Sequence, residues 1–366
     1  DFHGLGARWI AERTTKLGEL TLTAGVDYDR SEDDRRGYEN FIGPTLGVKG
    51  QLRRNEIDTV TSIDPYLQAL LKSGPWQWSL GVRHSRVSFK VEDKYIVGIN
   101  GDDSGSVRFS ETTPAIGVVY AISPALNVYA SAGKGFETPT LNELSYGTDG
   151  KFNFSLKPST SKQLEVGTKA IVGDNTRVNA ALFHIETDDE IVVAGASGGR
   201  TSYQNAGRTL RQGVELAAES EFTRSLTGRA ALTWMKAEYD EAFVSRGTTI
   251  PSGNRIPGVP QFVAYAELAW EPVAGLTVAG ETVYRGKVQV NDANDEHPAP
   301  AYTLFNLRLS AEQQQGPWTF GQLLRVDNLF DRKHIGSVIV GDGNGRFYEP
   351  GLERSLYAGV SARYRF

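Results

Sequence analysis

The sequence predicts an all-β fold, a transmembrane antiparallel up-and-down β-barrel, from three observations. The last segment, Leu352–Phe366, alternates apolar and polar side chains with a period of two, which is typical of a β-strand with one apolar face. Segments with this alternation recur along the 366-residue chain, and the connections between them are alternately short and long. Lipid-facing and interior-facing side chains alternate in this way in a transmembrane barrel, whose short turns all lie at one end.

The last segment also has the aromatic end that is typical of such a barrel. Its apolar side chains include Leu356 and Val360, and Arg354 is the one interruption of the set. Tyr364 and Phe366 close the segment, and aromatic side chains gather where a barrel wall meets the membrane surface. A soluble domain rarely ends on a strand of this kind, so the segment favours a membrane protein.

Composition agrees with a barrel and excludes several other classes of protein. No run of about 18 apolar residues is present, so the sequence predicts no transmembrane helix. A slightly polar mean hydropathy fits a barrel, because each strand shows lipid only every second residue. The absence of cysteine excludes disulfides and thiolate metal sites. A net charge of -5, spread along the chain, argues against a nucleic-acid-binding protein.

The alternation predicts each strand in turn. Between residues 260 and 271, for example, the even-numbered side chains from Phe262 to Trp270 are apolar, while Gln261 and Glu267 are polar. The predicted strands are Phe2–Arg13, Glu19–Arg30, Asp58–Lys72, Trp76–Val91, Val107–Ile122, Asn127–Phe136, Ser159–Val172, Arg177–Thr187, Tyr203–Phe222, Leu226–Tyr239, Pro260–Glu271, Leu276–Val290, Tyr302–Glu312, Trp318–Arg332 and Leu352–Phe366. By parity, the side chains expected to face lipid include Leu268, Leu309 and Val360, and those expected to face the interior or its rim include Glu267, Arg308 and Arg363.

The connections indicate which ends of the strands lie together. Short connections such as Ser73–Pro75 and Val273–Gly275 are rich in Gly, Pro, Ser and Asn, as tight hairpins require. Long connections such as Ser31–Ile57 and Lys333–Gly351 are polar and rich in glycine. In outer-membrane barrels the short turns are periplasmic and the long loops extracellular. The C-terminus is therefore expected at the periplasmic face.

The fifteen predicted strands form an odd number, whereas closed bacterial barrels have an even number. An open sheet edge cannot lie in lipid with unpaired backbone groups. We therefore expect further strands before Asp1. The alternative is a soluble β-sandwich or propeller, but the chain shows no blade-length repeat, and strands of ten or more residues are long for a sandwich.

No motif in the sequence assembles a catalytic or cofactor site. Gly195–Gly199 matches the G-x-S-x-G nucleophile elbow, but that elbow requires a following helix, and here another strand is predicted. Asn291–Glu296 alternates oxygen-bearing side chains like a calcium loop, but it lacks the glycine and the distal glutamate, so a solvated loop is expected. We expect no enzyme activity, no cofactor and no resident metal.

Three stretches resemble a known family. Tyr129–Leu144 resembles the Y-A-S-x-x-K/R-G-F-x-x-P-T-x-x-E-L stretch of TonB-dependent outer-membrane receptors. Val326–Lys333 resembles their N-L-F-D stretch, with His334 where the family usually has tyrosine. Arg363–Phe366 resembles their terminal aromatic signature. The resemblance covers the chain from about Val107 to its end.

The resemblance implies a 22-stranded barrel closed by an N-terminal plug domain. Residues 1–366 would then be the C-terminal portion of the barrel domain, with its last fifteen strands. The plug, the first strands and the TonB box would lie outside this chain. The family takes up ferric siderophores, cobalamin or other scarce nutrients, powered by TonB. The implied partners are outer-membrane lipid and lipopolysaccharide, the TonB complex and a small-molecule ligand. No nucleic acid is implied, and a monomer is expected.

A narrower resemblance concerns the ligand. Ile191–Ala194, Gly198–Thr209, Val290–Asn294 and Gly341–Arg346 resemble the subgroup that contains the receptor for pyrroloquinoline quinone. A ferric siderophore-type chelate is the expected cargo, with pyrroloquinoline quinone as one alternative. A passive porin-like channel, with no plug and no energy coupling, is another.

The ligand site is expected in the long loops, because the strands are committed to the wall. Arginine can bond both oxygens of a carboxylate, and aromatic rings add stacking area at low entropic cost. The alternative for each such residue taken singly is an ordinary solvated loop position. The candidate ligand-binding residues are Arg200, Tyr203, Arg255, Arg346, Tyr348 and Tyr146.

Overall fold

The chain is described by a computed structural model of residues 1–366, of which 99–100, 146–151 and 198–199 lie outside the described part, as do the side chains at 196, 197 and 200. Within the described residues, fifteen long strands form one sheet in chain order, and the paired strands run antiparallel. Their bounds are β1 Phe2–Thr15, β2 Gly18–Tyr38, β5 Leu52–Ser73, β6 Trp76–Asp93, β7 Gly105–Ser123, β8 Leu126–Glu137, β9 Ser159–Val172, β10 Thr176–Asp188, β13 Thr209–Thr223, β14 Leu226–Tyr239, β17 Phe262–Val273, β18 Leu276–Arg285, β19 Tyr302–Gln315, β20 Trp318–Asp327 and β23 Ser355–Tyr364. The predicted up-and-down order is confirmed.

Short elements fold within the long connections, where the sequence predicted only loops. Their bounds are β3 Phe41–Ile42, β4 Thr45–Leu46, α1 Leu141–Leu144, β11 Ile191–Ser197, β12 Arg200–Asn205, β15 Phe243–Ser245, β16 Thr248–Ile250, β21 Ile335–Val338 and β22 Tyr348–Pro350. Each of the four strand pairs is an antiparallel hairpin. Within the described residues no helix has both the length and the apolar composition needed to cross a bilayer.

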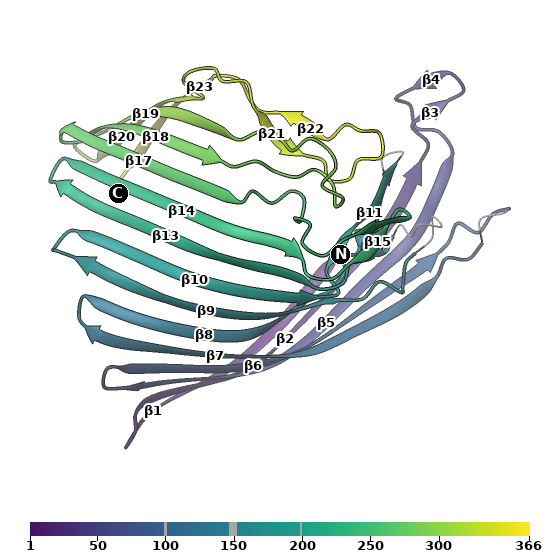
Figure 1. Cartoon of the computed structure of the whole chain (residues 1–366), viewed down its shortest axis with the longest axis horizontal. Helices are drawn as coiled ribbons and strands as arrows, with labels where there is room; N and C mark the ends of the chain where they lie inside the picture. Colours follow the sequence, from purple (N-terminus) through teal and green to yellow (C-terminus); the bar gives the residue numbers. More distant parts are fainter. Residues whose placement is uncertain (99–100, 146–151, 198–199) are drawn as a thin grey trace. The chain divides into compact units, whose positions relative to one another are not determined.

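The chain divides into two compact units. Figure 1 shows the turns after β13 and β17 at one end of unit 2, and the hairpin β21–β22 at the other. We call these the short-turn end and the long-connection end. Unit 1 holds Asp1–Val118, Ser131–Gln163 and Thr187–Ala206, and unit 2 holds Val119–Ala130, Leu164–Glu186 and Gly207–Phe366.

The predicted strand Trp318–Arg332 was wrong at its end, because an asparagine turns the chain after Asp327. Asn328 is 3 % exposed and has a left-handed backbone, with φ of 51°. Its side-chain oxygen accepts from the Arg332 amide (2.8 Å), and its nitrogen donates to the carbonyls of Arg332 (2.9 Å) and Leu352 (3.2 Å). One side chain therefore closes the turn and ties it to the approach to β23.

Four other predicted strands were wrong by five residues or more at one end. The strand predicted to end at Arg30 continues to Tyr38, and the strand predicted from Asp58 begins at Leu52, because these two segments of the predicted connection Ser31–Ile57 pair with each other. The strand predicted from Tyr203 begins at Thr209, because Tyr203 pairs instead with Val193 in the hairpin β11–β12. The strand predicted to reach Val290 ends at Arg285. Beyond it, Val288 exchanges main-chain hydrogen bonds with Ala299, so this segment pairs within its own loop rather than with a neighbouring strand.

The two faces of the sheet in unit 2 differ as the parity predicted. Leu268 and Leu309 are exposed on the apolar face. On the polar face, Arg308 lies 2.9 Å from Glu267 and 3.7 Å from Glu281. Arg325 donates two bonds to Glu281, at 2.8 and 2.7 Å. The register sets like charges side by side on neighbouring strands, and diagonal ion pairs compensate them.

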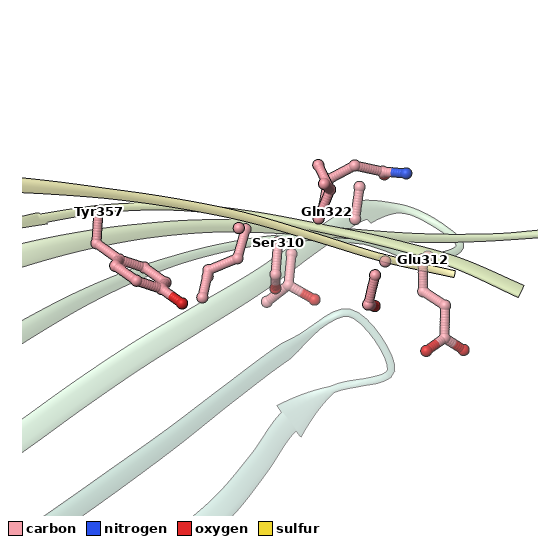
Figure 2. A pocket seen from close by; sticks show the side chains of 12 residues that line it. Ser310, Glu312, Gln322 and Tyr357 are labelled. Carbon is pink, nitrogen blue, oxygen red and sulfur yellow. The ribbon is translucent and has the colours of Figure 1, made fainter. Parts of the chain in front are cut away.

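The polar face of unit 2 has a depression toward its short-turn end. A cavity of about 470 Å³ lies there, and glycine and serine line much of it. Figure 2 shows the side chains of Ser310, Glu312 and Tyr357 on one side of the ribbon and that of Gln322 on the other. The small side chains leave room on this face.

We predict that arginine in place of Leu309 destabilises the protein by about 2–4 kcal/mol, because an arginine on the apolar face would lie in hydrocarbon near the bilayer midplane. The matched control is Ser310→Arg, which places the same side chain one residue along β19, where the polar face has space. Unfolding of the protein in lipid vesicles by denaturant measures both changes. Equal costs for the two variants would contradict a lipid-facing surface here.

Candidate ligand-binding loops

Three connections of unit 2 pack together at its long-connection end. They are residues 240–261, 286–301 and 328–354, which we call the loop cluster. Main-chain bonds join the first and the third to the second: Gly258 donates to the Gln289 carbonyl, and Gly341 donates to that of Val290, both at 2.9 Å. Ile250, Ile256, Val290 and Phe347 of these connections are buried, and so is Tyr239 at the end of β14. These connections are therefore folded structure rather than solvated loops.

Asparagine and aspartate side chains fasten the loop cluster. The Asn254 side chain donates to the carbonyls of Asp292 (2.9 Å) and Ala293 (3.0 Å). The Asn294 side chain accepts from the Arg255 amide (2.8 Å) and donates to the Arg255 carbonyl (2.9 Å). The Asp292 carboxylate accepts from the Tyr239 hydroxyl at 2.7 Å.

These bonds correct the prediction of a solvated loop at Asn291–Glu296. Asn291 donates to the Asp295 carboxylate at 2.6 Å, and the oxygens of Asp292 and Asn294 are occupied as described. Within the described residues, no three histidine, aspartate or glutamate side chains gather as a metal site. The side-chain oxygens of Asp292 and Asn294 therefore tie residues 286–301 to Tyr239 and to Arg255.

Burial sets the titration of Asp292. Withdrawal from water raises the pKa of this carboxyl, and the hydrogen bonds from Tyr239 and Ser245 oppose the rise. Asp292 belongs to a connection and not to a strand of the sheet. The protonation state of Asp292 therefore affects the stability of the loop cluster.

The structure brings three of the six candidate ligand-binding residues into the loop cluster. The Asn294 side chain bonds to both the amide and the carbonyl of Arg255, and the Arg255 side chain is exposed. Arg346 is exposed too, with its amide bonded to the Asp342 carboxylate at 2.7 Å. In the described part of the chain, no hydrogen bond or ion pair is made by either guanidinium. Lys287, Arg332, Lys333 and Arg354 of the cluster are exposed as well, so Arg255 and Arg346 are two of several cations available to an anion.

Tyr348 is exposed, as Arg346 is, and Phe347 between them is buried. This alternation agrees with the shared parity of Arg346 and Tyr348 in the sequence. The Tyr348 hydroxyl donates to the His297 carbonyl, which joins the hairpin β21–β22 to residues 286–301. The ring face of Tyr348, rather than its hydroxyl, is what remains for a ligand.

The other three candidates lie in or beside unit 1. Tyr203 is half-buried against a core of Phe89, Phe109, Leu144 and Leu156, and this burial raises the pKa of its phenol. Tyr203 is therefore a packing residue of the hairpin β11–β12. Tyr146 and the side chain of Arg200 lie outside the described residues.

The first three residues of the G-x-S-x-G match, Gly195–Ser197, end β11, and Gly198 and Gly199 lie outside the described residues. A strand and not a helix follows, so the geometry of a nucleophile elbow is not formed. Neither Asp292 nor its partner Tyr239, 53 residues away, was predicted from the sequence. A carboxylate cluster on β2 and β5, which includes Glu56 and Asp58, was not predicted either. The run of acidic residues from Glu32 to Asp34 was the available signal.

We predict that the loop cluster loses stability as the pH rises. Because the pKa of Asp292 is raised above its ordinary value of 3.8, protonation favours the folded loops. The contribution is complete below that value and is lost as the pH rises through the raised pKa. The hydrogen-exchange protection factor of the Arg255 amide should fall across this range.

In Asp292→Asn that dependence on pH should disappear, because the amide side chain does not titrate. Glu353→Gln removes an exposed carboxyl of the same cluster and should leave the dependence unchanged. A protection factor that falls in the same way with and without Asp292 would assign the effect to another group.

Known proteins with similar sequences are outer-membrane receptors and transporters. The ferrioxamine B receptor of Salmonella typhimurium strain LT2 is 26 % identical over 355 residues, which cover 93 % of this chain and 47 % of that receptor. The ferrichrome outer membrane transporter/phage receptor of Escherichia coli K12 is 25 % identical, over 94 % of this chain and 46 % of the relative. The chain therefore spans about half the length of the curated relatives it matches.

Solved structures agree in fold. The unliganded ferric citrate transporter FecA superposes with a TM-score of 0.81 at 17 % identity, over 99 % of this chain and 54 % of that one. The siderophore receptor PiuA of Acinetobacter baumannii gives a TM-score of 0.77 at 17 % identity, over 99 % and 55 % of the two chains. The family model described as TonB dependent receptor-like, beta-barrel matches residues 2–329, and this chain belongs to that family.

Proposed function

We propose that this chain is part of an outer-membrane, TonB-dependent receptor that imports a ferric siderophore-type chelate. The observation that carries the proposal is the pair of exposed guanidiniums, Arg255 and Arg346, held by a folded loop cluster. The relatives named as receptors for ferrioxamine B and ferrichrome support the cargo class. Homologues of this family are outer-membrane proteins.

The proposal assigns an orientation to the sheet. The short-turn end and the C-terminus face the periplasm, and the loop cluster faces the outside of the cell, as in outer-membrane barrels. The apolar face contacts outer-membrane lipid and lipopolysaccharide. A plug domain, the first strands and a TonB box lie in a segment of the protein beyond this chain, and energy reaches the barrel through them. The receptor acts as a monomer and carries no enzymatic activity.

Recognition follows from the chemistry of the loop cluster. A guanidinium presents a planar fork that can bond two oxygens of a carboxylate or of another anionic group. Arg255 and Arg346 each project from a backbone fixed by side-chain hydrogen bonds, to Asn294 and Asp342. A backbone that is already ordered loses less freedom when ligand binds. The exposed ring of Tyr348 adds an aromatic surface beside Arg346.

Import of pyrroloquinoline quinone and passive conduction remain predictions of the sequence. Pyrroloquinoline quinone is also anionic and aromatic, so the same side chains suit it. A passive channel would need no plug and no TonB. Uptake measured in cells with and without TonB separates active import from passive conduction.

We predict that Arg255→Ala and Arg346→Ala each weaken binding of the imported chelate about tenfold, since a hydrogen bond to a charged group contributes about 1.5–3 kcal/mol. Arg200→Ala tests the remaining arginine candidate. Arg224→Ala, at the turn between β13 and β14, is the matched control and should behave like the parent. Whole-cell binding and uptake of radioactive iron chelates, at equal receptor levels in the membrane, provide the measurement.

If all three arginine variants bind and import like the parent, the loops do not contain the site. Loss of import without loss of binding would indicate that the arginines act after recognition.

A further inference from the structure

One face of unit 1 carries an apolar groove. The register of β5 and β6 sets Leu67 beside Val82 and Ala69 beside Leu80, so these side chains share a face. Leu67, Leu80 and Val82 are exposed on it. A cavity of about 690 Å³ is lined by these apolar side chains and by two lysines, Lys134 and Lys162.

Along β6 the same face changes from apolar to basic. Because side chains alternate between the two faces of a strand, Arg86 and Lys90 point the same way as Val82. Arg86 lies directly opposite Ile63 of β5, which is exposed. On β7, Arg108 Nε donates to the hydroxyl of Ser88 at 3.1 Å. Ser88 lies between Arg86 and Lys90 in the alternation, so the Arg108 guanidinium belongs to this face too.

Most of these cations have no carboxylate partner. Arg86, Lys90, Arg108 and Lys162 are exposed, and none of them makes an ion pair with a described residue. Lys134 is the exception, since it lies 2.9 Å from Glu111. We call Arg86, Arg108 and Lys162 the basic rim of the groove.

A neighbouring strand of unit 1 shows the usual arrangement. On β2, Tyr28 lies opposite Ile63 of β5, so Arg30, two residues further on, belongs to the same face. Arg30 is ion-paired with Glu32 at 2.7 Å, whose side chain shares that face. The basic rim is therefore set apart by its lack of carboxylates, and not by the presence of arginine.

We propose that this face binds one lipopolysaccharide molecule at a fixed place, with an acyl chain in the groove and a phosphate on the basic rim. The inference rests on the outer-membrane location and orientation within the proposed function, and it assigns residues to the lipid contact. A guanidinium can bond two phosphate oxygens through its planar fork, and the Lys162 ammonium adds a point charge. Basic side chains beside an apolar membrane surface are typical contacts of anionic headgroups.

The order of side chains along β6 favours this occupant. In the proposed orientation the turn before Trp76 is periplasmic, so the chain passes Leu80 and Val82 first and reaches Arg86 and Lys90 toward the outside of the cell. This is the order of acyl chain and phosphate in a lipid of the outer leaflet. A zwitterionic lipid would fill the groove, but it brings its own cation to the basic rim and gains little there.

The test offers the purified full-length receptor two lipids with the same acyl chains: lipid A with its phosphates, and lipid A after a phosphatase has removed them. Native mass spectrometry measures the lipid bound to each receptor across a titration. The parent should bind the phosphorylated form more tightly. Arg86→Gln, Arg108→Gln and Lys162→Gln should each weaken that binding about fivefold, the contribution expected of one cation at an anionic membrane surface.

The triple variant should lose the preference and should bind the dephosphorylated form like the parent. Arg30→Gln is the matched control, because it removes a cation of the same face that is already paired, and it should keep the preference. Ala69→Phe fills the groove and should weaken binding of both lipids alike. All these variants should import the chelate like the parent, which shows that they fold.

Equal binding of the two lipids by the parent, or a preference that survives the triple variant, would overturn the inference. Phosphatidylglycerol that binds as tightly as lipid A would overturn the choice of lipopolysaccharide, and unchanged binding by Ala69→Phe would overturn the place of the acyl chain. A parent that imports no chelate and still prefers the phosphorylated lipid would contradict the proposed cargo and support this inference.

Discussion

Backbone hydrogen bonding between neighbouring antiparallel strands is the constraint on which the rest of the structure depends. It fixes the register, and the register decides which side chains share a face. In unit 2 it sets Glu267 beside Glu281 and Arg308 beside Arg325, so the charges pair diagonally across four strands. A slip of one residue would turn these charges to the apolar face. The ion pairs and the apolar face therefore specify the same register.

The same constraint is the reason why we propose that the connections recognise the ligand. The strand residues are committed to pairing and to the two faces, so a ligand site must be built from what joins them. The loop cluster meets this need with a small core and with amide and carboxylate side chains that bond to main chain. Tyr239 ends β14 and also donates to Asp292, so strand and loop share one residue. The exposed side chains of Arg255 and Arg346 therefore project from backbone that is held by hydrogen bonds.

The period of two was enough to predict the strands, because alternation is a local property of the sequence. It failed at ends that depend on contacts distant in the chain, such as the Asn328 side chain bonded to the Leu352 carbonyl. The capping box of Thr140 and Glu143 at α1 is a local signal that was available. The burial of Asp292, and the opposition of Asp33 to Asp58, follow from partners that no local pattern shows.

The orientation of the sheet in the outer membrane is the central claim, since the ligand site, the cargo and the coupling all follow from it. The chain has no cysteine, so a single introduced thiol reports one position. Gly343 and Ala274 are both exposed, the first in the loop cluster and the second in the turn after β17. On intact cells, an impermeant thiol reagent should label Gly343→Cys and should reach Ala274→Cys only after the outer membrane is opened. Labelling of Ala274→Cys but not of Gly343→Cys on intact cells would contradict the account.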